Sequence, residues 1–238
     1  EADVRVLVTR PEDDAAPLMA ELKARGIDAV LAPLLTINFF DGSLLDLSGV
    51  QALLMSSANG VRAFAGRSGN RALPLVAVGD ATARAAKNLG FGDIASATGD
   101  VDDLARLATE KFGQKDGALL HPVGTNVAGD LARRLRKAGF NYRREVLYEA
   151  ETAERLPVVA CEGLRNGAFD GVLIYSPRTG RTFKRLAEAE GLGNGLASVR
   201  AYCLSKNVAE AVSDLAWASI LTADRPEQVA LLTLFDET

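Results

Sequence analysis

Short apolar runs alternate with helix-like segments along the chain. "VRVLVTR" is rich in Val and bounded by Pro11, which predicts a strand that is buried on both faces. The next segment, "DDAAPLMAELKARG", has Leu18 and Leu22 at helical spacing and predicts a helix that stops at Gly26. "IDAVLAPLL" then predicts a second strand. Strands that alternate with helices favour parallel sheets with helices on both faces.

The same order of segments occurs twice. The opening strand–helix–strand unit returns in "GALLHPVGTNVAGDLARRLRKAGFNYRREVLYEA", and "ALLMSSANGVRAF" (52–64) returns as "VLIYSPRTGRTF" (172–183). A third pair begins with "LVAVGDATARAAKN" and "VRAYCLSKNVAEAV", and we expect Asp100 and Asp224 to cap its final helices. Matched positions lie roughly 110–125 residues apart, far beyond solenoid periods of about 20–50 residues. We therefore expect two copies of one α/β unit, with a single three-layer domain as the alternative.

The composition is typical of a globular protein. The chain has 238 residues, of which 48% are hydrophobic and 24% charged, and a formal net charge of -4, which argues against a general nucleic-acid binder. No apolar run approaches the roughly 20 residues of a membrane span, and the first residues lack the pattern of a signal peptide. Cys161 and Cys203 lie far apart in apolar surroundings and are expected to be reduced, buried thiols. We expect a cytoplasmic monomer.

Polar residues gather where strands are expected to end. In parallel α/β folds ligands bind beyond the carboxyl ends of the strands. The residues expected there are Thr9, Arg10, Ser56, Ser57, Gly79, Asp80, His121, Ser176 and Ser205. Hydroxyls, amides and the free N–H groups at helix starts attract anions, so such a set facing one cleft would bind a ligand with several negative groups. For any single serine at a strand–helix junction, a simple N-cap is the alternative.

The usual catalytic and metal-binding patterns are missing from the sequence. It lacks the motifs of dinucleotide, nucleoside triphosphate and serine-hydrolase sites. His121 is the only histidine, and it is expected to be a structural residue at a strand end. No metal site is therefore expected. Arg10 and Arg178 are candidates for pairing with ligand carboxylates, although arginines near turns are also often merely solvated.

Tyr148 ends an alternating run, "NYRREVLYEA", in which Tyr142, Val146 and Tyr148 are expected to share one face. An ordinary packed tyrosine is the simple interpretation. If Tyr148 faces a cleft, its phenol can act as a weak general acid.

The ordered set "VLVTRP", "LLMSSANGVRAF", "AVGDATARAAKNLG", "LYEA", "VLIYSPRTG" and "CLSKNVAEA" resembles uroporphyrinogen-III synthase over nearly the whole chain. The order and spacing of the motifs carry this resemblance. It implies two flavodoxin- or Rossmann-like parallel-sheet domains of the HemD kind, joined by a two-stranded linker. Residues 1–36 and 150–238 would form a discontinuous first domain, residues 40–146 an inserted second domain, and residues 35–39 and 144–150 the linker strands.

The resemblance also implies a reaction. The family cyclises hydroxymethylbilane, a linear tetrapyrrole with eight carboxylates, with loss of water and inversion of the terminal pyrrole ring, and it uses neither metal nor organic cofactor. Loss of the terminal hydroxyl gives a reactive azafulvene cation, so the protein mainly has to hold the folded conformer of the chain. The substrate is the only partner implied, with neither nucleic acid nor membrane. A non-catalytic two-domain cleft-type binding protein for an anionic ligand is the alternative function.

Residue by residue, the resemblance makes Tyr148 the linker tyrosine that assists departure of the hydroxyl. Ser56 and Ser176 match strand-end hydroxyls of the cleft, and Arg10 belongs to the "TRP" signature. The other expected substrate-binding residues are Ser57, Asn59, Arg178, Ser205 and Asn207. The chain departs from the family where Ser205, Lys206 and Asn207 replace a frequent Gly-Pro-Thr, and where Asn59 stands in place of an Arg found in some members.

Overall fold

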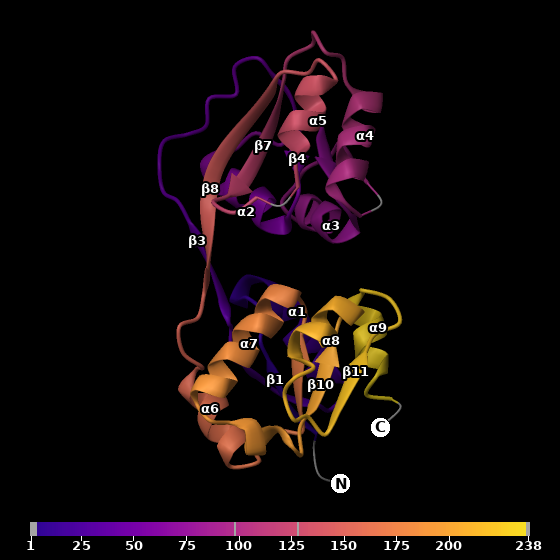
Figure 1. Ribbon diagram of the computed structural model, residues 1–238. Helices are drawn as coiled ribbons and strands as arrows, with labels where there is room; N and C mark the ends of the chain where they lie inside the picture. Colours follow the sequence, from indigo (N-terminus) through magenta and orange to yellow (C-terminus); the bar gives the residue numbers. More distant parts are fainter. Residues whose placement is uncertain (1–3, 98, 128, 237–238) are drawn as a thin grey trace. The chain divides into compact units, whose positions relative to one another are not determined.

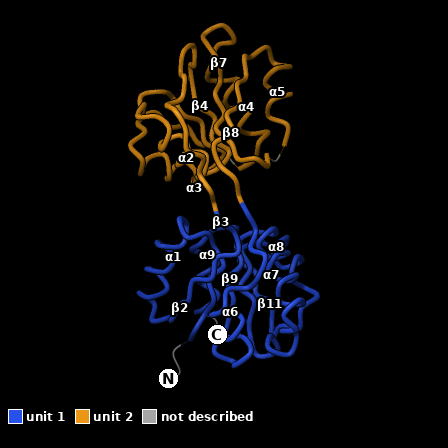
Figure 2. The backbone as a smooth tube through the Cα atoms, turned by 90° about the vertical axis from the view of Figure 1, so that its left-hand side faces the viewer, with its two compact units in different colours: residues 1–36, 151–238 blue, residues 37–150 orange. Residues whose placement is uncertain are grey.

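The computed structural model describes residues 4–97, 99–127 and 129–236 (Figure 1). The chain divides into two compact units, which Figure 2 colours separately. Unit 1 combines residues 1–36 with residues 151–238, and unit 2 consists of residues 37–150. Unit 2 is therefore inserted into the chain of unit 1.

Unit 1 contains a five-stranded sheet in the order β11-β10-β9-β1-β2, and all of its pairs are parallel. Its strands are β1 (Arg5–Val8), β2 (Asp28–Leu31), β9 (Gly171–Ile174), β10 (Arg200–Cys203) and β11 (Ser219–Thr222). Its helices are α1 (Glu12–Ala24), α6 (Val158–Arg165), α7 (Pro177–Ala189), α8 (Lys206–Val212) and α9 (Gln228–Thr233), with a short 3-10 helix, η1 (Gly193–Leu196).

Unit 2 is built around a six-stranded sheet in the order β3-β8-β7-β4-β5-β6. Its strands are β3 (Leu35–Phe39), β4 (Val50–Met55), β5 (Leu75–Ala77), β6 (Ile94–Ser96), β7 (Ala118–Gly124) and β8 (Tyr142–Thr152). Its helices are α2 (Ala58–Arg67), α3 (Asp80–Asn88), α4 (Val101–Lys111) and α5 (Leu131–Lys137). The strands from β8 to β6 pair in parallel. β3 and β8 pair antiparallel. Phe40 N–H donates to Leu147 O at one end of this pair, and Ala153 N–H donates to Leu34 O at the other.

The two sheets share one topology. The order β11-β10-β9-β1-β2 of unit 1 corresponds strand for strand to β6-β5-β4-β7-β8 of unit 2, and β3 is the additional strand. The two units differ in the order of these strands along the chain. In unit 1 the counterparts of β7 and β8 are β1 and β2, which come first because unit 2 is inserted after β2. The α/β class with parallel sheets, predicted from the sequence, is confirmed.

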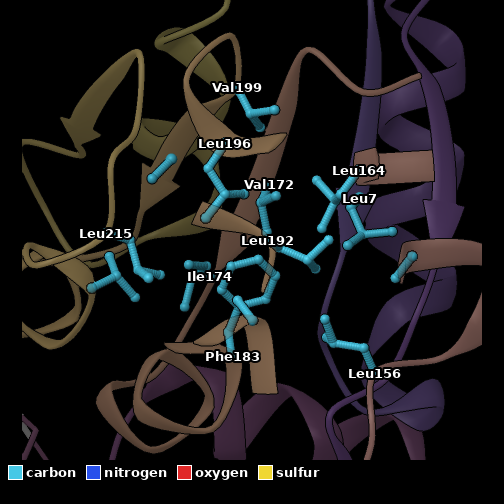
Figure 3. Packing of buried hydrophobic residues seen from close by; sticks show 14 of the residues in the cluster. Leu7, Leu156, Leu164, Val172, Ile174, Phe183, Leu192, Leu196, Val199 and Leu215 are labelled. Carbon is cyan, nitrogen blue, oxygen red and sulfur yellow. The ribbon is translucent and has the colours of Figure 1, made fainter. Parts of the chain in front are cut away.

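Alternate residues of the strands supply the cores on the two faces of each sheet. In unit 1, Leu7, Val172 and Ile174 pack with residues of α6, α7 and α8, as Figure 3 shows for this cluster. Their neighbours in the strands, Val8 and Leu173 among them, pack with α1 and α9 on the other face. A strand covered on both faces must be apolar throughout, which explains the unbroken apolar runs in the sequence.

Unit 2 follows the same rule. Ala52 and Leu54 of β4 pack with α4 and α5, and Leu53 and Met55 pack with α2 and α3. All seven residues of β7 are buried. The polar side chains within these two strands are Gln51, near the start of β4, and His121, in the middle of β7.

One strand departs from the predicted alternation. The ladder between β7 and β8 pairs Val123 with Val146 and Gly124 with Tyr148, so one extra residue of β8 lies between the two pairs. Such a bulge turns the following side chain to the other face. Tyr142 packs with the α4 and α5 side, whereas the Tyr148 hydroxyl reaches Ser57 at the start of α2, on the opposite side. The prediction that Tyr142, Val146 and Tyr148 share a face is wrong.

The predicted helix ends are partly confirmed. Gly26 ends α1 with a φ of 73°, and Asp100 caps α4 by accepting a hydrogen bond from the Asp103 N–H at 2.8 Å. The cap predicted at Asp224 is wrong, because α9 begins only at Gln228, with Glu227 in the cap position. Pro226 precedes that start; it has no N–H to donate and disfavours helical backbone in the residue before it.

The two aspartates form a matched pair for a stability test. Asp100→Ala removes a cap hydrogen bond, and we expect it to lower the free energy of unfolding by about 1 kcal/mol. Asp224→Ala removes the same carboxylate from a loop and should change it by less than about 0.5 kcal/mol. Urea titration of both variants measures the difference, and equal losses would contradict the cap assignment.

Candidate active site

One group of predicted site residues lies at the carboxyl end of β4 and on β7 and β8, the two strands that follow β4 on one side of the unit 2 sheet. Ser56 and Ser57 follow β4, His121 lies within β7, and Tyr148 lies within β8. The backbone of Ser57 is extended, with φ -158° and ψ 157°. Adjacent residues in extended backbone point to opposite sides, so the two serines serve different partners.

Ser57 connects the start of α2 to Tyr148. Its Oγ accepts the Gly60 N–H at 3.1 Å, which makes it the N-cap of α2, and the same oxygen lies 2.8 Å from the Tyr148 hydroxyl. The Tyr148 ring lies directly against Gly124, where an added Cβ would come within 2.7 Å of the ring. The centroid of the Tyr148 ring lies 6.2 Å from the centroid of the Phe39 ring. Tyr148 is therefore held by packing along its ring and by one hydrogen bond at its tip.

Ser56 belongs to a second hydrogen-bonded set. Its Oγ lies 2.8 Å from His121 Nε2, and His121 Nδ1 lies 2.7 Å from the Tyr142 hydroxyl. His121 is only 1% exposed. Burial lowers its pKa from 6.5 to about 4, with a smaller contribution from the charge of Arg144, so the imidazole is neutral at neutral pH.

Asn59, in the first turn of α2, is engaged within its own helix. Its Oδ1 accepts a hydrogen bond from Arg62 Nη1 at 2.7 Å. The side-chain amide nitrogen is the part of Asn59 with which a carboxylate can hydrogen-bond.

In unit 1 the two predicted serines are N-caps. Ser176 Oγ accepts the Thr179 N–H at 3.1 Å, and Ser205 Oγ accepts the Val208 N–H at 3.4 Å. The Ser176 hydroxyl also donates to Thr179 Oγ1 at 3.0 Å. The capping interpretation therefore holds for both serines, and their role toward a ligand rests on the helix starts they support.

Arg10 follows the carboxyl end of β1 in the unit 1 sheet and is held there by two contacts. Its guanidinium carbon lies 4.2 Å from the ring centroid of Tyr175, and its Nη1 donates to Gln228 Oε1 at 3.3 Å. Burial raises the pKa of Tyr175 to about 12, although the Arg10 charge acts in the opposite direction. Among the described residues the buried Tyr175 hydroxyl has no hydrogen-bond partner. Arg10 thus presents a cation whose position is fixed by the ring beneath it.

Arg178 and Asn207 lie in the first turns of α7 and α8, where Arg178 is half-buried and Asn207 exposed. The first turns of α2 and α7 carry no acidic residue, in contrast to those of α1, α3 and α4. An acid in the first turn neutralises the positive end of the helix dipole. The first turn of α8 also lacks an acidic residue, so the starts of α2, α7 and α8 are better places for an anionic group than those of α1, α3 and α4.

The two cysteines are buried and free, as predicted. Burial raises the pKa of Cys203 to about 12, which excludes it as a thiolate nucleophile at neutral pH. Within residues 4–97, 99–127 and 129–236, no three His, Cys, Asp or Glu side chains are grouped as a metal site requires. None of the helices in the described part of the chain has the length and apolar character of a membrane span.

Comparison with known proteins identifies the family. A family model described as uroporphyrinogen-III synthase HemD matches residues 16–233. The chain belongs to the uroporphyrinogen-III synthase HemD family. Its activity is that of a cyclising lyase of tetrapyrrole biosynthesis, and family membership does not favour the alternative of a non-catalytic binding protein. No curated protein matches the chain.

Solved structures of uroporphyrinogen-III synthases share the fold. The enzyme of Helicobacter pylori is 15% identical, with a TM-score of 0.64, and the match covers 98% of this chain and 99% of that one. A mutant enzyme of Thermus thermophilus is 18% identical, with a TM-score of 0.54, and the match covers 98% of each chain. At these identities the likeness concerns the fold.

Within each unit of this synthase, the structure shows which predicted residues meet. Ser57 and Tyr148 are hydrogen-bonded, whereas Ser56 is bonded to His121. The prediction that His121 lies at a strand end is wrong, because it is the middle residue of β7. Tyr142, the partner of His121 Nδ1, was not among the residues predicted for the site. No sequence pattern revealed that contact, because it depends on the register in which β8 pairs with β7.

The lowered pKa of His121 predicts a loss of stability in acid. The unfolded chain, with an ordinary histidine pKa near 6.5, binds a proton before the folded protein does, so stability falls as the pH drops from 6.5 toward 4. We expect the free energy of unfolding to fall by about 2 kcal/mol between pH 7 and 5, a range in which most carboxylates stay ionised. Urea titrations at several pH values measure the loss.

His121→Gln is the control, because it keeps a hydrogen-bonding side chain that does not titrate. It should abolish most of the pH dependence in this range. An equal loss in the variant and the parent protein would show that another group is responsible.

Proposed function

We propose that Tyr148 is the general acid of the synthase and that the strand-end groups of each unit bind carboxylates of hydroxymethylbilane. The observation that carries this proposal is the 2.8 Å hydrogen bond between Tyr148 and Ser57, at a strand end beside the start of α2. The functional division follows the two domains expected from the sequence, residues 1–36 with 150–238 and residues 40–146. Residues 35–39 and 144–150 act as the linker strands between them.

The hydrogen-bond arrangement around Ser57 leaves the Tyr148 proton available. Because Ser57 Oγ already accepts the Gly60 N–H, its own hydrogen can be donated to the Tyr148 oxygen. The phenol hydrogen is then directed to the substrate. After proton transfer, the Ser57 hydroxyl and the nearby helix start stabilise the phenolate.

The chemical step balances with this one proton. The phenol hydrogen passes to the terminal hydroxyl of the substrate, the carbon–oxygen bond breaks, and water leaves. Electrons of the adjacent pyrrole nitrogen form the azafulvene cation, which the substituted carbon of the terminal ring attacks. The resulting spiro intermediate fragments and recloses with that ring inverted, and loss of a ring proton, which restores the proton given up by Tyr148, completes the macrocycle. The pyrrole supplies the electrons, so the protein mainly controls the conformation.

The carboxylates require anchoring groups, and both units offer them. In unit 2 we assign this role to Ser56, to Asn59 and to the start of α2. In unit 1 we assign it to Arg10, Ser176, Arg178, Ser205 and Asn207. Charge-assisted hydrogen bonds from arginine and hydroxyl groups to carboxylates are short and strong. Several anchoring groups are needed to hold a long, flexible substrate in one conformation.

The isomer that forms is the direct test of the activity. Incubation with freshly prepared hydroxymethylbilane should yield isomer III, because the bound chain is kept from closing directly to the symmetric isomer I. Chromatographic separation of the oxidised products distinguishes the two isomers. Formation of isomer I alone, at the rate seen without protein, would rule the activity out.

Tyr148→Phe tests the general acid. We expect kcat to fall roughly 10²-fold, toward the lower limit for general acid catalysis, because the cation forms readily once the substrate is folded. KM and the free energy of unfolding should change little. Ser57→Ala keeps the phenol but removes its partner, and a smaller decrease in kcat is expected. Unchanged turnover of Tyr148→Phe would remove Tyr148 from the mechanism.

We also propose that the synthase is a monomer and acts in the cytoplasm. The small number of large apolar side chains that are exposed in the described part of the chain supports a monomer. Sedimentation equilibrium at micromolar concentration decides the oligomeric state, and a mass twice that of the chain would contradict it.

A further inference from the structure

Three side chains form a continuous hydrogen-bonded line from the interior of unit 2 to its strand ends. Tyr142, which is 7% exposed, contacts His121 Nδ1, and His121 Nε2 contacts the half-buried Ser56. The general acid proposed above does not use this line. Two of its three members, Tyr142 and His121, are buried, and burying their polar groups is costly unless the hydrogen bonds of these groups are satisfied.

The histidine tautomer decides which group donates and which accepts in each of the two hydrogen bonds. A neutral imidazole has one N–H donor and one acceptor nitrogen. If Nε2 carries the hydrogen, Tyr142 donates to Nδ1 and His121 donates to the Ser56 oxygen. If Nδ1 carries the hydrogen, every bond reverses and Ser56 must donate inward to His121.

The surroundings of Tyr142 favour the first direction. A phenol hydroxyl is a better donor than acceptor, and an aliphatic hydroxyl such as that of serine is the better acceptor of the two. The Arg136 guanidinium carbon lies 5.5 Å from the ring centroid of Tyr142, and a cation at this position strengthens the phenol as a donor. Arg144 adds positive charge near both Tyr142 and His121. Burial raises the pKa of the Tyr142 phenol, while the charges of Arg144 and Arg136 act in the opposite direction, so the phenol keeps its proton and can donate it.

We propose that His121 is a positioning residue that makes Ser56 a dedicated hydrogen-bond donor to a substrate carboxylate. With the Ser56 oxygen accepting from Nε2–H, the serine hydrogen is left to point away from the protein interior. The opposite tautomer would present only lone pairs to the carboxylate, which repel it. This inference rests on the proposed contact of Ser56 with the substrate and adds the group that orients it.

The histidine tautomer can be read directly, because the chain contains a single histidine. Long-range ¹H–¹⁵N correlation spectra of the ¹⁵N-histidine-labelled protein, without substrate, should show the Nε2–H tautomer near neutral pH. Tyr142→Phe should shift the population toward a mixture. A predominant Nδ1–H tautomer in the parent protein would overturn the proposal. This readout is independent of turnover, so its failure is distinguishable from a failure of the proposed function.

Kinetics test whether His121 and Tyr142 act through Ser56. Ser56→Ala should raise KM for hydroxymethylbilane about tenfold, the effect of one hydrogen bond to a charged group, with kcat changed less than about twofold. Tyr142→Phe should raise KM about threefold. In the Ser56→Ala background, Tyr142→Phe should have no further effect on KM, because the group that it orients is already gone.

Multiplicative effects on KM, or an unchanged KM in Ser56→Ala, would overturn the proposal. The matched control is Tyr202→Phe, which removes the hydroxyl of a buried tyrosine that stacks on Phe235 at 4.2 Å in the core of unit 1. It should leave KM unchanged. Thermal unfolding of each variant separates a loss of folding from a loss of orientation.

Discussion

The burial of β7 on both faces is the constraint on which the site in unit 2 depends. Every residue of this strand is buried, so a polar side chain within it must find its partners inside the protein. His121 satisfies the condition with one hydrogen bond at each ring nitrogen. Because both bonds are fixed by neighbouring strands, the imidazole carries the influence of a deeply buried tyrosine to a serine at the end of the sheet. The hydrogen bonds that His121 needs because it is buried are thus the same bonds that connect it to Ser56.

A second consequence is the separation of Ser56 from Ser57. Extended backbone directs the two neighbours to opposite sides, and the bulge in β8 brings Tyr148 to the side of Ser57. Gly124 makes this possible, because a side chain there would occupy the space of the Tyr148 ring. Binding and proton transfer are therefore assigned to adjacent residues without competition for the same hydroxyl. Substitution of either serine should disturb one role and leave the other.

The sequence predicts those features that depend on local physical chemistry. The buried strands, the helix end at Gly26 and the cap at Asp100 follow from apolar runs, positive φ and a side-chain acceptor next to free N–H groups. The face of Tyr148 was predicted wrongly, because a bulge has no clear signature in an alternating run. The partnership of His121 with Tyr142 depends on strand register, which is a property of the folded sheet. The order of motifs nevertheless identified the family, because it reflects the whole topology rather than any single contact.

The repeat also shows how one scaffold supports different chemistry in its two copies. Ser57 and Ser176 are each the N-cap of the helix after the corresponding strand, so Ser176 is the structural counterpart of Ser57 rather than of Ser56. Counted from these caps, the place of Ser56 is taken in unit 1 by Tyr175, which lies beneath the guanidinium of Arg10. Where unit 2 offers an oriented hydroxyl, unit 1 therefore offers a cation held on an aromatic ring. A neutral donor and a fixed charge both bind carboxylates, but only the charge attracts them over several ångströms through water. If the proposed contacts with the substrate are made, the repeated fold supplies two kinds of anchor to a ligand whose negative groups are spread along a flexible chain.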